Sequence, residues 1–174
     1  MIKEIFIGIF LTALLIRISA LILSIKNERK LKSEGAKEYG KINTLILISL
    51  HFIFYVASFA EGIARKTQFG YITKAGIAIY VFSILVLLLV IHELKKFWTV
   101  KIIIAKKHKL NTSFIFKYIR HPNYFLNVLP ELIGITLIFK SWLVFLVLFP
   151  VYVISLAIRI SQEEKIMKQK FKDY

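Results

Sequence analysis

Five apolar segments, separated by charged or turn residues, set the pattern of this sequence. Each is close to the ~20 residues that an α-helix needs to cross the hydrocarbon core of a bilayer. The segments cover about residues 5–25, 43–64, 75–94, 124–139 and 142–160. The pattern predicts an all-α integral membrane protein with about five transmembrane helices, and the chain length predicts a single unit over residues 1–174.

The last two segments are separated only by Lys140 and Ser141. So short a connection predicts a tight antiparallel helical hairpin. The fourth segment is short for a full span and contains Pro130. If the hairpin folds back on itself, residues just before segment 124–139 meet residues just after segment 142–160.

Composition and charge narrow the class of protein. The chain is 57% hydrophobic, yet it carries 25 Lys and Arg against 10 Asp and Glu, a net charge of +15. A basic nucleic-acid-binding protein is one interpretation of that charge, but apolar runs of this length favour a membrane protein. The chain has no cysteine, which excludes disulfides, thiolate metal ligands and cysteine nucleophiles.

The distribution of the basic residues predicts the orientation. With five crossings, loop 26–42, loop 95–123 and tail 161–174 lie on one side and hold six, eight and four Lys or Arg, 18 in all, against five on the other side. The positive-inside rule then places the N-terminus outside and the basic loops in the cytoplasm, in the cytoplasmic (inner) membrane. Basic residues that flank spans also hold helices at anionic lipids, each contributing about 1 kcal/mol. We interpret five lysines in this way: Lys95, Lys96, Lys106, Lys107 and Lys109.

A polar cluster precedes the fourth segment. Proline suits the first turn of a helix, so Pro122 places His121 near the helix N-cap, where free N–H groups and the helix dipole favour anions such as a carboxylate. The alternative is that these residues only anchor a helix end at the membrane interface. The cluster consists of Tyr118, Arg120, His121, Pro122, Asn123 and Tyr124.

A second polar cluster follows the fifth segment. Arg159 and Glu163 are four residues apart and share one helix face, and Glu164 lies on the neighbouring flank. Each cluster alone is a weak signal. A two-residue hairpin brings the two clusters to the same membrane depth, which favours a site between them.

Further ionisable residues fall within or at the ends of apolar segments. Such groups cost roughly 2.5–3.5 kcal/mol at a helix centre and are candidate functional residues. Arg17 and Glu131 either pair with each other to hold two helices together or line an acceptor pocket. His51 and Glu61 are too far apart on one helix to share a site, and a structural hydrogen bond is the favoured role for each. The set is Arg17, His51, Glu61, His92, Glu93 and Glu131, and none of it has a spacing typical of a metal site.

The two clusters together resemble the signature of the isoprenylcysteine carboxyl methyltransferases and their bacterial relatives. One bacterial branch, which includes methyltransferases for the hydroxyl of long-chain alkylpyrones, is similar over most of the chain. The family usually has Gly-Pro-Tyr-Arg before this signature, and here Phe114-Ile115-Phe116-Lys117 stands instead. The segments that carry the wider resemblance are Asn27-Glu28-Arg29, Glu34-Gly35-Ala36-Lys37-Glu38-Tyr39-Gly40, His51 and Phe97-Trp98-Thr99-Val100-Lys101-Ile102.

The resemblance implies S-adenosylmethionine as the methyl donor, held between the hairpin ends and the tail. The seven glycines form no Gly-x-Gly phosphate loop. The donor's carboxylate suits the helix N-terminus, its ribose hydroxyls suit Glu163 or Glu164, and an aromatic ring at Tyr118 or Tyr124 suits its adenine or sulfonium. The predicted site comprises Arg159 and Arg120 as catalytic residues; Tyr118, His121, Pro122, Asn123, Tyr124, Glu163 and Glu164 as donor-binding residues; and Glu131 and Arg17 as acceptor-binding residues.

The resemblance thus implies an O-methyltransferase that acts on a lipophilic acceptor. Arg159 is our choice for orienting the carboxyl or hydroxyl oxygen of that acceptor. Methyl transfer needs no metal, and nothing in the sequence indicates binding of nucleic acid. The acceptor is either prenylcysteine-like or a long-chain phenol, pyrone or fatty acid. Two alternatives stay open at this point. One is an NADPH-dependent membrane reductase of the steroid-reductase type, which has a similar C-terminal hairpin. The other is a non-catalytic membrane scaffold whose polar residues only anchor helices.

Overall fold

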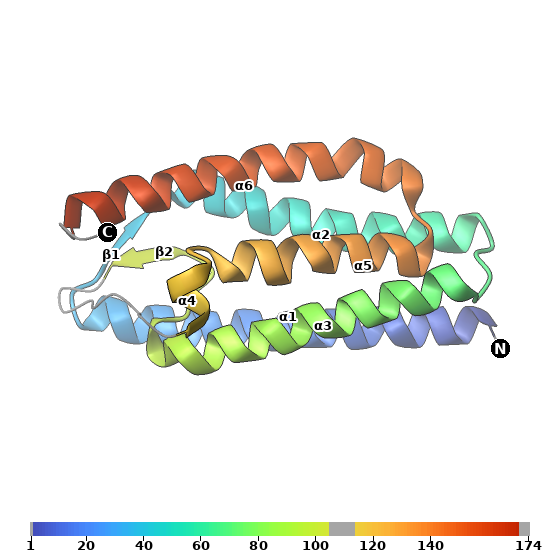
Figure 1. Cartoon of the computed structure of the whole chain (residues 1–174), viewed down its shortest axis with the longest axis horizontal. Coiled ribbons are helices and arrows are strands. Elements are labelled where there is room, and N and C mark those ends of the chain that lie inside the picture. Colours follow the sequence, from blue (N-terminus) through green and yellow to red (C-terminus); the bar gives the residue numbers. More distant parts are fainter. Residues whose placement is uncertain (1, 105–113, 171–174) are drawn as a thin grey trace.

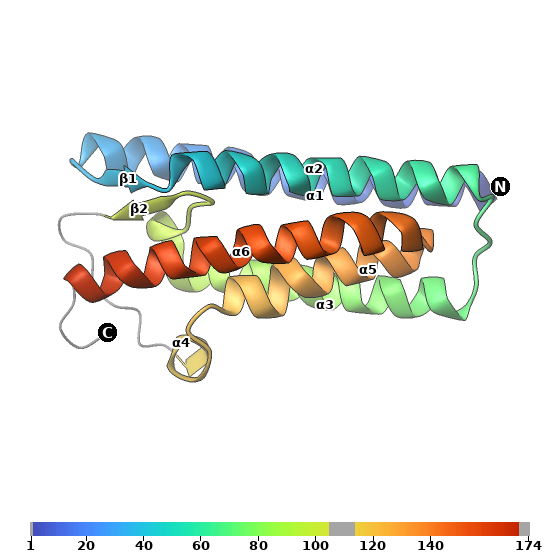
Figure 2. The same cartoon turned by 90° about the horizontal axis from the view of Figure 1, so that it is seen from above.

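The computed structural model describes residues 2–104 and 114–170, which form an elongated bundle of helices (Figures 1 and 2). Lys106, Lys107 and Lys109, three of the lysines assigned above to lipid contact, lie outside the described residues. The elements are α1 (Ile2–Ser33), β1 (Lys37–Tyr39), α2 (Lys41–Ala64), α3 (Tyr71–Leu94), η1 (Lys95–Phe97), β2 (Ile102–Ile104), α4 (Phe114–Tyr118), η2 (Asn123–Val128), α5 (Leu129–Phe139) and α6 (Trp142–Lys170).

The prediction of an all-α membrane protein is confirmed. Among the described residues, four helices are long and apolar enough to cross a membrane: Lys3–Ser33, Lys41–Ala64, Tyr71–Phe97 and Trp142–Lys170. The fourth predicted segment is a shorter apolar helix in which the six-residue π-helix η2 continues into the 11-residue α5. At 1.5 Å per residue it is about 25 Å long, somewhat less than the ~30 Å hydrocarbon core.

The predicted hairpin turn is also present. Lys140 ends α5 in the left-handed region, with φ 50° and ψ 40°, and its N–H donates to the carbonyl of Thr136. Such a residue closes a helix sharply. This turn and the α2–α3 connection lie at the same end of the bundle (Figure 1). We call it the turn end, and we call the other end, where α6 finishes and β1 and β2 lie, the basic end.

Three glycines bring helices close together toward the turn end. A Cβ added at Gly76 would lie 2.7 Å from the backbone nitrogen of Ile138 and 2.8 Å from the carbonyl oxygen of Gly134. A Cβ at Gly62 would lie 2.9 Å from the carbonyl oxygen of Phe139. Small residues allow such close contact between membrane helices. Here they allow α5 to pack against both α3 and α2.

The basic end contains structure that the apolar pattern does not predict. Both α1 and α6 continue about ten residues past their apolar segments. Strand β1 pairs antiparallel with β2, with Glu38 opposite Ile103. Segments that are far apart in the sequence thereby join, and the chain that follows α3 is fixed next to the start of α2.

Candidate active site

The two predicted polar clusters lie together at the basic end of the hairpin. The buried ring of His121 has Nδ1 3.9 Å from Glu163 Oε2 and Nε2 3.5 Å from Glu164 Oε1. The Tyr124 hydroxyl donates to Glu163 Oε2 at 2.7 Å, and the ring of Tyr124 stacks on His121 with centroids 5.7 Å apart. The side chains of Glu163 and Glu164 remain 32% and 30% exposed, so both carboxylates are open to a ligand.

Arg159 is 3% exposed, and three elements hold its guanidinium group. Nε donates to the Tyr124 hydroxyl at 3.2 Å, and Nη1 donates to the Thr44 hydroxyl at 2.6 Å. Nη2 donates to the Val100 carbonyl at 2.5 Å. A planar guanidinium with several fixed partners keeps one orientation. Arg159 therefore joins α6 to η2, to the first turn of α2 and to the segment after η1.

The Val100 carbonyl is positioned by the end of α1. The Asn27 side-chain amide donates to the carbonyl of Trp98 at 2.9 Å, and the Ser24 hydroxyl accepts from the Val100 N–H at 2.9 Å. Both bonds use side chains of α1 to fix the segment that follows η1. Two segments that carry the family resemblance, one containing Asn27 and the other containing Trp98, thus contact each other directly.

A network of charges surrounds this junction. The Lys101 ammonium lies 2.8 Å from Glu28 and 3.5 Å from Glu38, and Lys32 pairs with both carboxylates. Burial opposes the ionisation of Glu38, but the hydrogen bond from Lys32 and the nearby ammonium charges outweigh it, so that the pKa of this carboxyl is lowered. The network ties α1 to β1 and to the start of β2.

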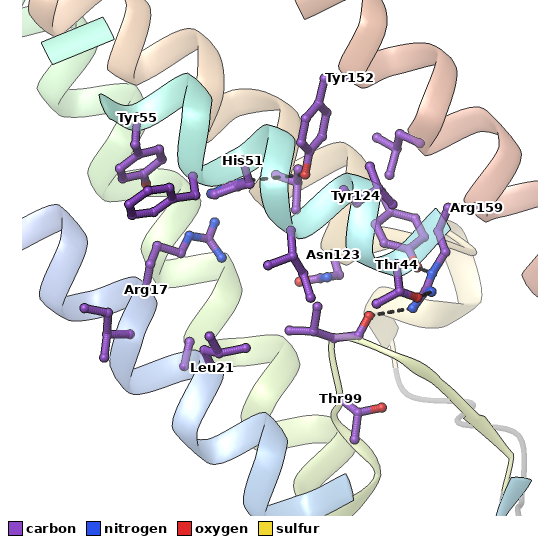
Figure 3. Close-up of a pocket in the computed structure, with 18 of the residues that line it drawn as sticks. Arg17, Leu21, Thr44, His51, Tyr55, Thr99, Asn123, Tyr124, Tyr152 and Arg159 are labelled. Atoms are coloured by element: carbon purple, nitrogen blue, oxygen red, sulfur yellow. Dashed lines mark hydrogen bonds between the residues drawn. The ribbon is translucent and has the colours of Figure 1, made fainter. Parts of the chain in front are cut away.

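A cavity of about 220 Å³ extends from Arg159 into the bundle (Figure 3). Thr44, Tyr124 and Arg159 line it near the basic end, and Arg17, His51 and Tyr152 line it farther in. Apolar side chains form most of the remaining wall: Leu14, Ile18, Ala20, Leu21, Leu47, Ile48, Phe52, Val128 and Leu156. This combination of apolar walls with a few polar groups is typical of small-molecule sites.

A polar cluster lies at the inner end of the cavity. Arg17 forms a salt bridge with Glu131 and donates to Asn127 Oδ1 at 3.2 Å. Glu131 also accepts from the Tyr55 hydroxyl and has His51 Nε2 at 3.4 Å. On the other side of the imidazole ring, His51 Nδ1 is 3.2 Å from the Tyr152 hydroxyl, to which it is hydrogen bonded. Side chains of α1, α2, η2, α5 and α6 meet here.

Not all of the predicted site residues lie at the cavity. Arg17 lines the cavity, but Glu131 is fully buried behind Arg17. The two residues form a salt bridge, which is one of the two roles that the sequence analysis gave them. Asn123 lines the cavity, and Pro122 is buried beside His121. Arg120 and Tyr118 are exposed and do not line the cavity, so their roles stay predictions.

The sequence-based prediction missed several residues that line or build the site. Thr44, Tyr55 and Tyr152 are polar residues within apolar helices, and neutral hydroxyls carry too weak a signal to be singled out. The Val100 carbonyl is a backbone group that no residue pattern identifies. His51 was noted as an intramembrane histidine, but its partner Tyr152 lies 101 positions away. Only the fold brings these groups together.

The long apolar helices, together with a buried guanidinium between a polar cluster and an apolar cavity, define a multi-pass membrane protein with a ligand-sized site near one end. Comparison with known proteins adds the family. The model of the isoprenylcysteine carboxyl methyltransferase (ICMT) family matches residues 76–169, which is more than half of the chain. The chain therefore belongs to this family, and membership implies a membrane methyltransferase.

Two relatives are similar over most of their length. An uncharacterized protein of Haemophilus influenzae is 45% identical over 162 residues, which cover 93% of this chain and 94% of that protein. The uncharacterized protein YpbQ of Bacillus subtilis is 28% identical over 146 residues, which cover 83% of this chain and 85% of that protein. No solved structure gives a significant match.

Proposed function

We propose that this protein is an S-adenosylmethionine-dependent O-methyltransferase of the cytoplasmic membrane that acts on a carboxyl or hydroxyl group of a lipophilic acceptor. The observation that carries the proposal is the position of Arg159. Its guanidinium lines the apolar cavity and shares the Tyr124 hydroxyl with Glu163 of the polar cluster. One side chain thus lies between a place for a polar donor and a place for an apolar acceptor.

The residues of the polar cluster fit the donor. His121 Nε2 is buried, has no hydrogen-bond partner among the described residues, and lies 3.5 Å from Glu164. Glu163 and Glu164 offer partly exposed carboxylates for the amino group and hydroxyls of a nucleoside-linked amino acid. Tyr124 offers a fixed aromatic face to a cation. When bound, S-adenosylmethionine supplies an electrophilic methyl group, and its sulfur keeps the bonding electron pair when the methyl leaves.

Arg159 suits the orientation of an acceptor oxygen. A guanidinium has five N–H donors, and hydrogen bonds within the described residues use three of those of Arg159. The two others can hold a carboxylate or an acidic enolate, both ionised near neutral pH, so the chain need not supply a base. Positioning alone can lower the barrier by about 7–11 kcal/mol.

The cavity wall favours entry of the acceptor from the bilayer. Ile18, Leu21 and Phe52 of α1 and α2 line the cavity and are 44%, 36% and 57% exposed. Apolar side chains that are exposed on a membrane-spanning helix face lipid. A lipophilic acceptor could thus enter between α1 and α2, while the donor reaches Glu163 and Glu164 from the cytoplasm, where the positive-inside rule places the basic end.

Donor binding is the first test. Calorimetry of the purified protein in detergent should show S-adenosylhomocysteine binding, and Glu163→Gln or His121→Ala should weaken it about tenfold, because each removes a charged or buried polar contact. Glu34→Gln is the matched control, since Glu34 forms an exposed ion pair with Lys96. Binding of NADPH in place of S-adenosylhomocysteine would favour the reductase, and binding of neither by folded protein would contradict the proposal.

Methyl transfer is the second test. Membranes that contain the protein are incubated with methyl-labelled S-adenosylmethionine and a total lipid extract. We expect label in a lipid ester or ether that mass spectrometry then identifies. Label that appears equally with the Glu163→Gln protein would show that another enzyme made the product.

A further inference from the structure

The cavity has two polar regions at a fixed spacing. Thr44 on α2 faces Arg159 on α6, and His51 on α2 faces Tyr152 on α6. Both helices thus step seven residues from one pair to the next, which is two turns or roughly 10 Å at 1.5 Å per residue. The wall between the pairs is apolar and includes Leu47, Ile48 and Leu156. The cavity is therefore polar, apolar and polar again along its length.

The inner polar region carries no net charge when its salt bridge is ionised. The charges of Arg17 and Glu131 cancel in their salt bridge, and the imidazole of His51 and the hydroxyls of Tyr55 and Tyr152 add no charge when neutral. A second carboxylate or ammonium placed here would be an uncompensated charge in an apolar environment, which is costly. A neutral polar group that finds hydrogen-bond partners avoids this cost.

The inner region also presents both a donor and an acceptor to the cavity. Arg17 has guanidinium N–H groups beyond those that reach Glu131 and Asn127, and it lines the cavity. The Tyr152 oxygen has lone pairs in addition to its bond with His51. Figure 3 shows Arg17, His51 and Tyr152 pointing toward one another from three different helices. An alcohol matches this pair, because it can accept from Arg17 and donate to Tyr152.

We propose that Arg17, His51 and Tyr152 form a second binding subsite, which holds a neutral hydroxyl on the chain of an amphiphile whose reacting oxygen lies at Arg159. The placement of the reacting oxygen rests on the proposed function. An extended hydrocarbon chain covers the spacing of the two regions in about eight carbon atoms. The favoured acceptor class is therefore a long-chain compound with a hydroxyl about eight to nine carbons from the oxygen that is methylated.

The test compares two probes that differ only in this hydroxyl. Native mass spectrometry of the full-length protein in detergent measures the affinities of stearate and 10-hydroxystearate. One additional neutral hydrogen bond predicts about fivefold tighter binding of 10-hydroxystearate. In Tyr152→Phe and His51→Phe proteins the ratio of the two affinities should fall about fivefold, while the affinity for stearate changes less than about twofold, since the apolar wall is retained.

Tyr80→Phe is the matched control, because it removes the same hydroxyl from a tyrosine that does not line the cavity. Its affinity ratio should equal that of the unaltered protein. A ratio that Tyr152→Phe and His51→Phe leave unchanged, or the absence of binding of both probes, would overturn the subsite. The binding assay needs no methyl donor. If it gives the expected affinity ratios but the protein transfers no methyl group, only the proposed function is rejected. Methyl transfer with unchanged ratios would reject the subsite alone.

Discussion

At the turn end Glu61 places its carboxylate oxygens 3.1 and 2.9 Å from the N–H groups of Leu143 and Val144, whereas at the basic end Glu163 and Glu164 remain about one-third exposed. The first carboxylate caps a helix, since it accepts from two N–H groups that lack intrahelical partners. The other two lie beside a cavity. Glutamate therefore has a structural role at the turn end, whereas at the basic end its carboxylates are available to a ligand.

The two ends also differ in how closely their helices pack. Toward the turn end Gly62, Gly76 and Gly134 let the helices approach until no added Cβ fits. Toward the basic end the space between α1, α2 and α6 stays open as the cavity, and buried polar groups line it. A tightly packed end can hold the helices in place while the other end keeps space for a ligand. The following predictions test this division.

The largest effect is expected at Arg159. Arg159→Lys keeps the charge but loses the fork that contacts Thr44, Tyr124 and the Val100 carbonyl. We expect methyl transfer to fall at least about 100-fold, the size typical of losing a fixed transition-state contact. The donor's own contacts remain, so S-adenosylhomocysteine affinity should change less than about threefold. Initial rates and calorimetry measure the two quantities.

The matched control is Arg65→Lys at the turn end, where Arg65 is largely exposed and pairs with Glu61. It should leave the rate of methyl transfer unchanged. An equal loss of rate in both proteins would mean that the two ends do not differ in function.

The next effect concerns stability. Gly134→Ala places a Cβ 2.9 Å from the backbone nitrogen of Tyr80, so that α3 and α5 must move apart. Overpacking of this kind costs about 1–3 kcal/mol, and the thermal midpoint in detergent should fall. Gly8→Ala is the control, because a Cβ at Gly8 meets nothing within 4 Å. A midpoint that is equally low in both proteins would contradict the close packing at the turn end.

A third prediction exchanges the roles of two glutamates. Glu61→Gln should lower the thermal midpoint, because the amide keeps only one of the two acceptor oxygens and weakening a helix cap costs up to about 1 kcal/mol. It should leave S-adenosylhomocysteine affinity unchanged. Glu163→Gln should weaken S-adenosylhomocysteine binding and leave the thermal midpoint unchanged. Thermal melts and calorimetry on both proteins give four values. A loss of S-adenosylhomocysteine affinity in the Glu61→Gln protein would contradict the division, because it would show that the turn end also affects ligand binding.

The smallest effect is a pH dependence at the basic end. The pKa of Glu38 is lowered in the folded protein, so its ionised pairing adds stability above the ordinary carboxyl pKa, and this stability is lost as the pH falls through the lowered value. Over the pH range below the ordinary carboxyl pKa the loss should stay below about 1 kcal/mol, since Lys32 is partly exposed. The protection factors of the β1 and β2 amides, in which the intrinsic pH dependence of exchange is removed, should fall on acidification, and less so in Glu38→Gln. An equal fall in both proteins would assign the effect to another group.

The sequence predicted much of the fold because bilayer thickness imposes the length of apolar helices. The hairpin turn at Lys140 followed from the spacing of two such helices. The strand pair β1–β2 and the added turns of α1 and α6 did not, because they lie in polar sequence where membrane thickness imposes nothing. Likewise, the charge of Arg159 was noticeable at the end of an apolar segment, and its spacing of four residues drew attention to Glu163, whereas the neutral Thr44 and Tyr152 were not noticeable.

The sequence by itself determined that the chain lies in a membrane, that its last two helices return on each other, and that two polar clusters meet where they end. These conclusions depend on apolar length and on spacing along one chain. Only the tertiary structure decided that Val100 offers a carbonyl to Arg159, that Arg17 pairs with the buried Glu131, and that His51 faces Tyr152. These contacts join residues up to 114 positions apart, and their geometry depends on how the helices pack rather than on any local pattern.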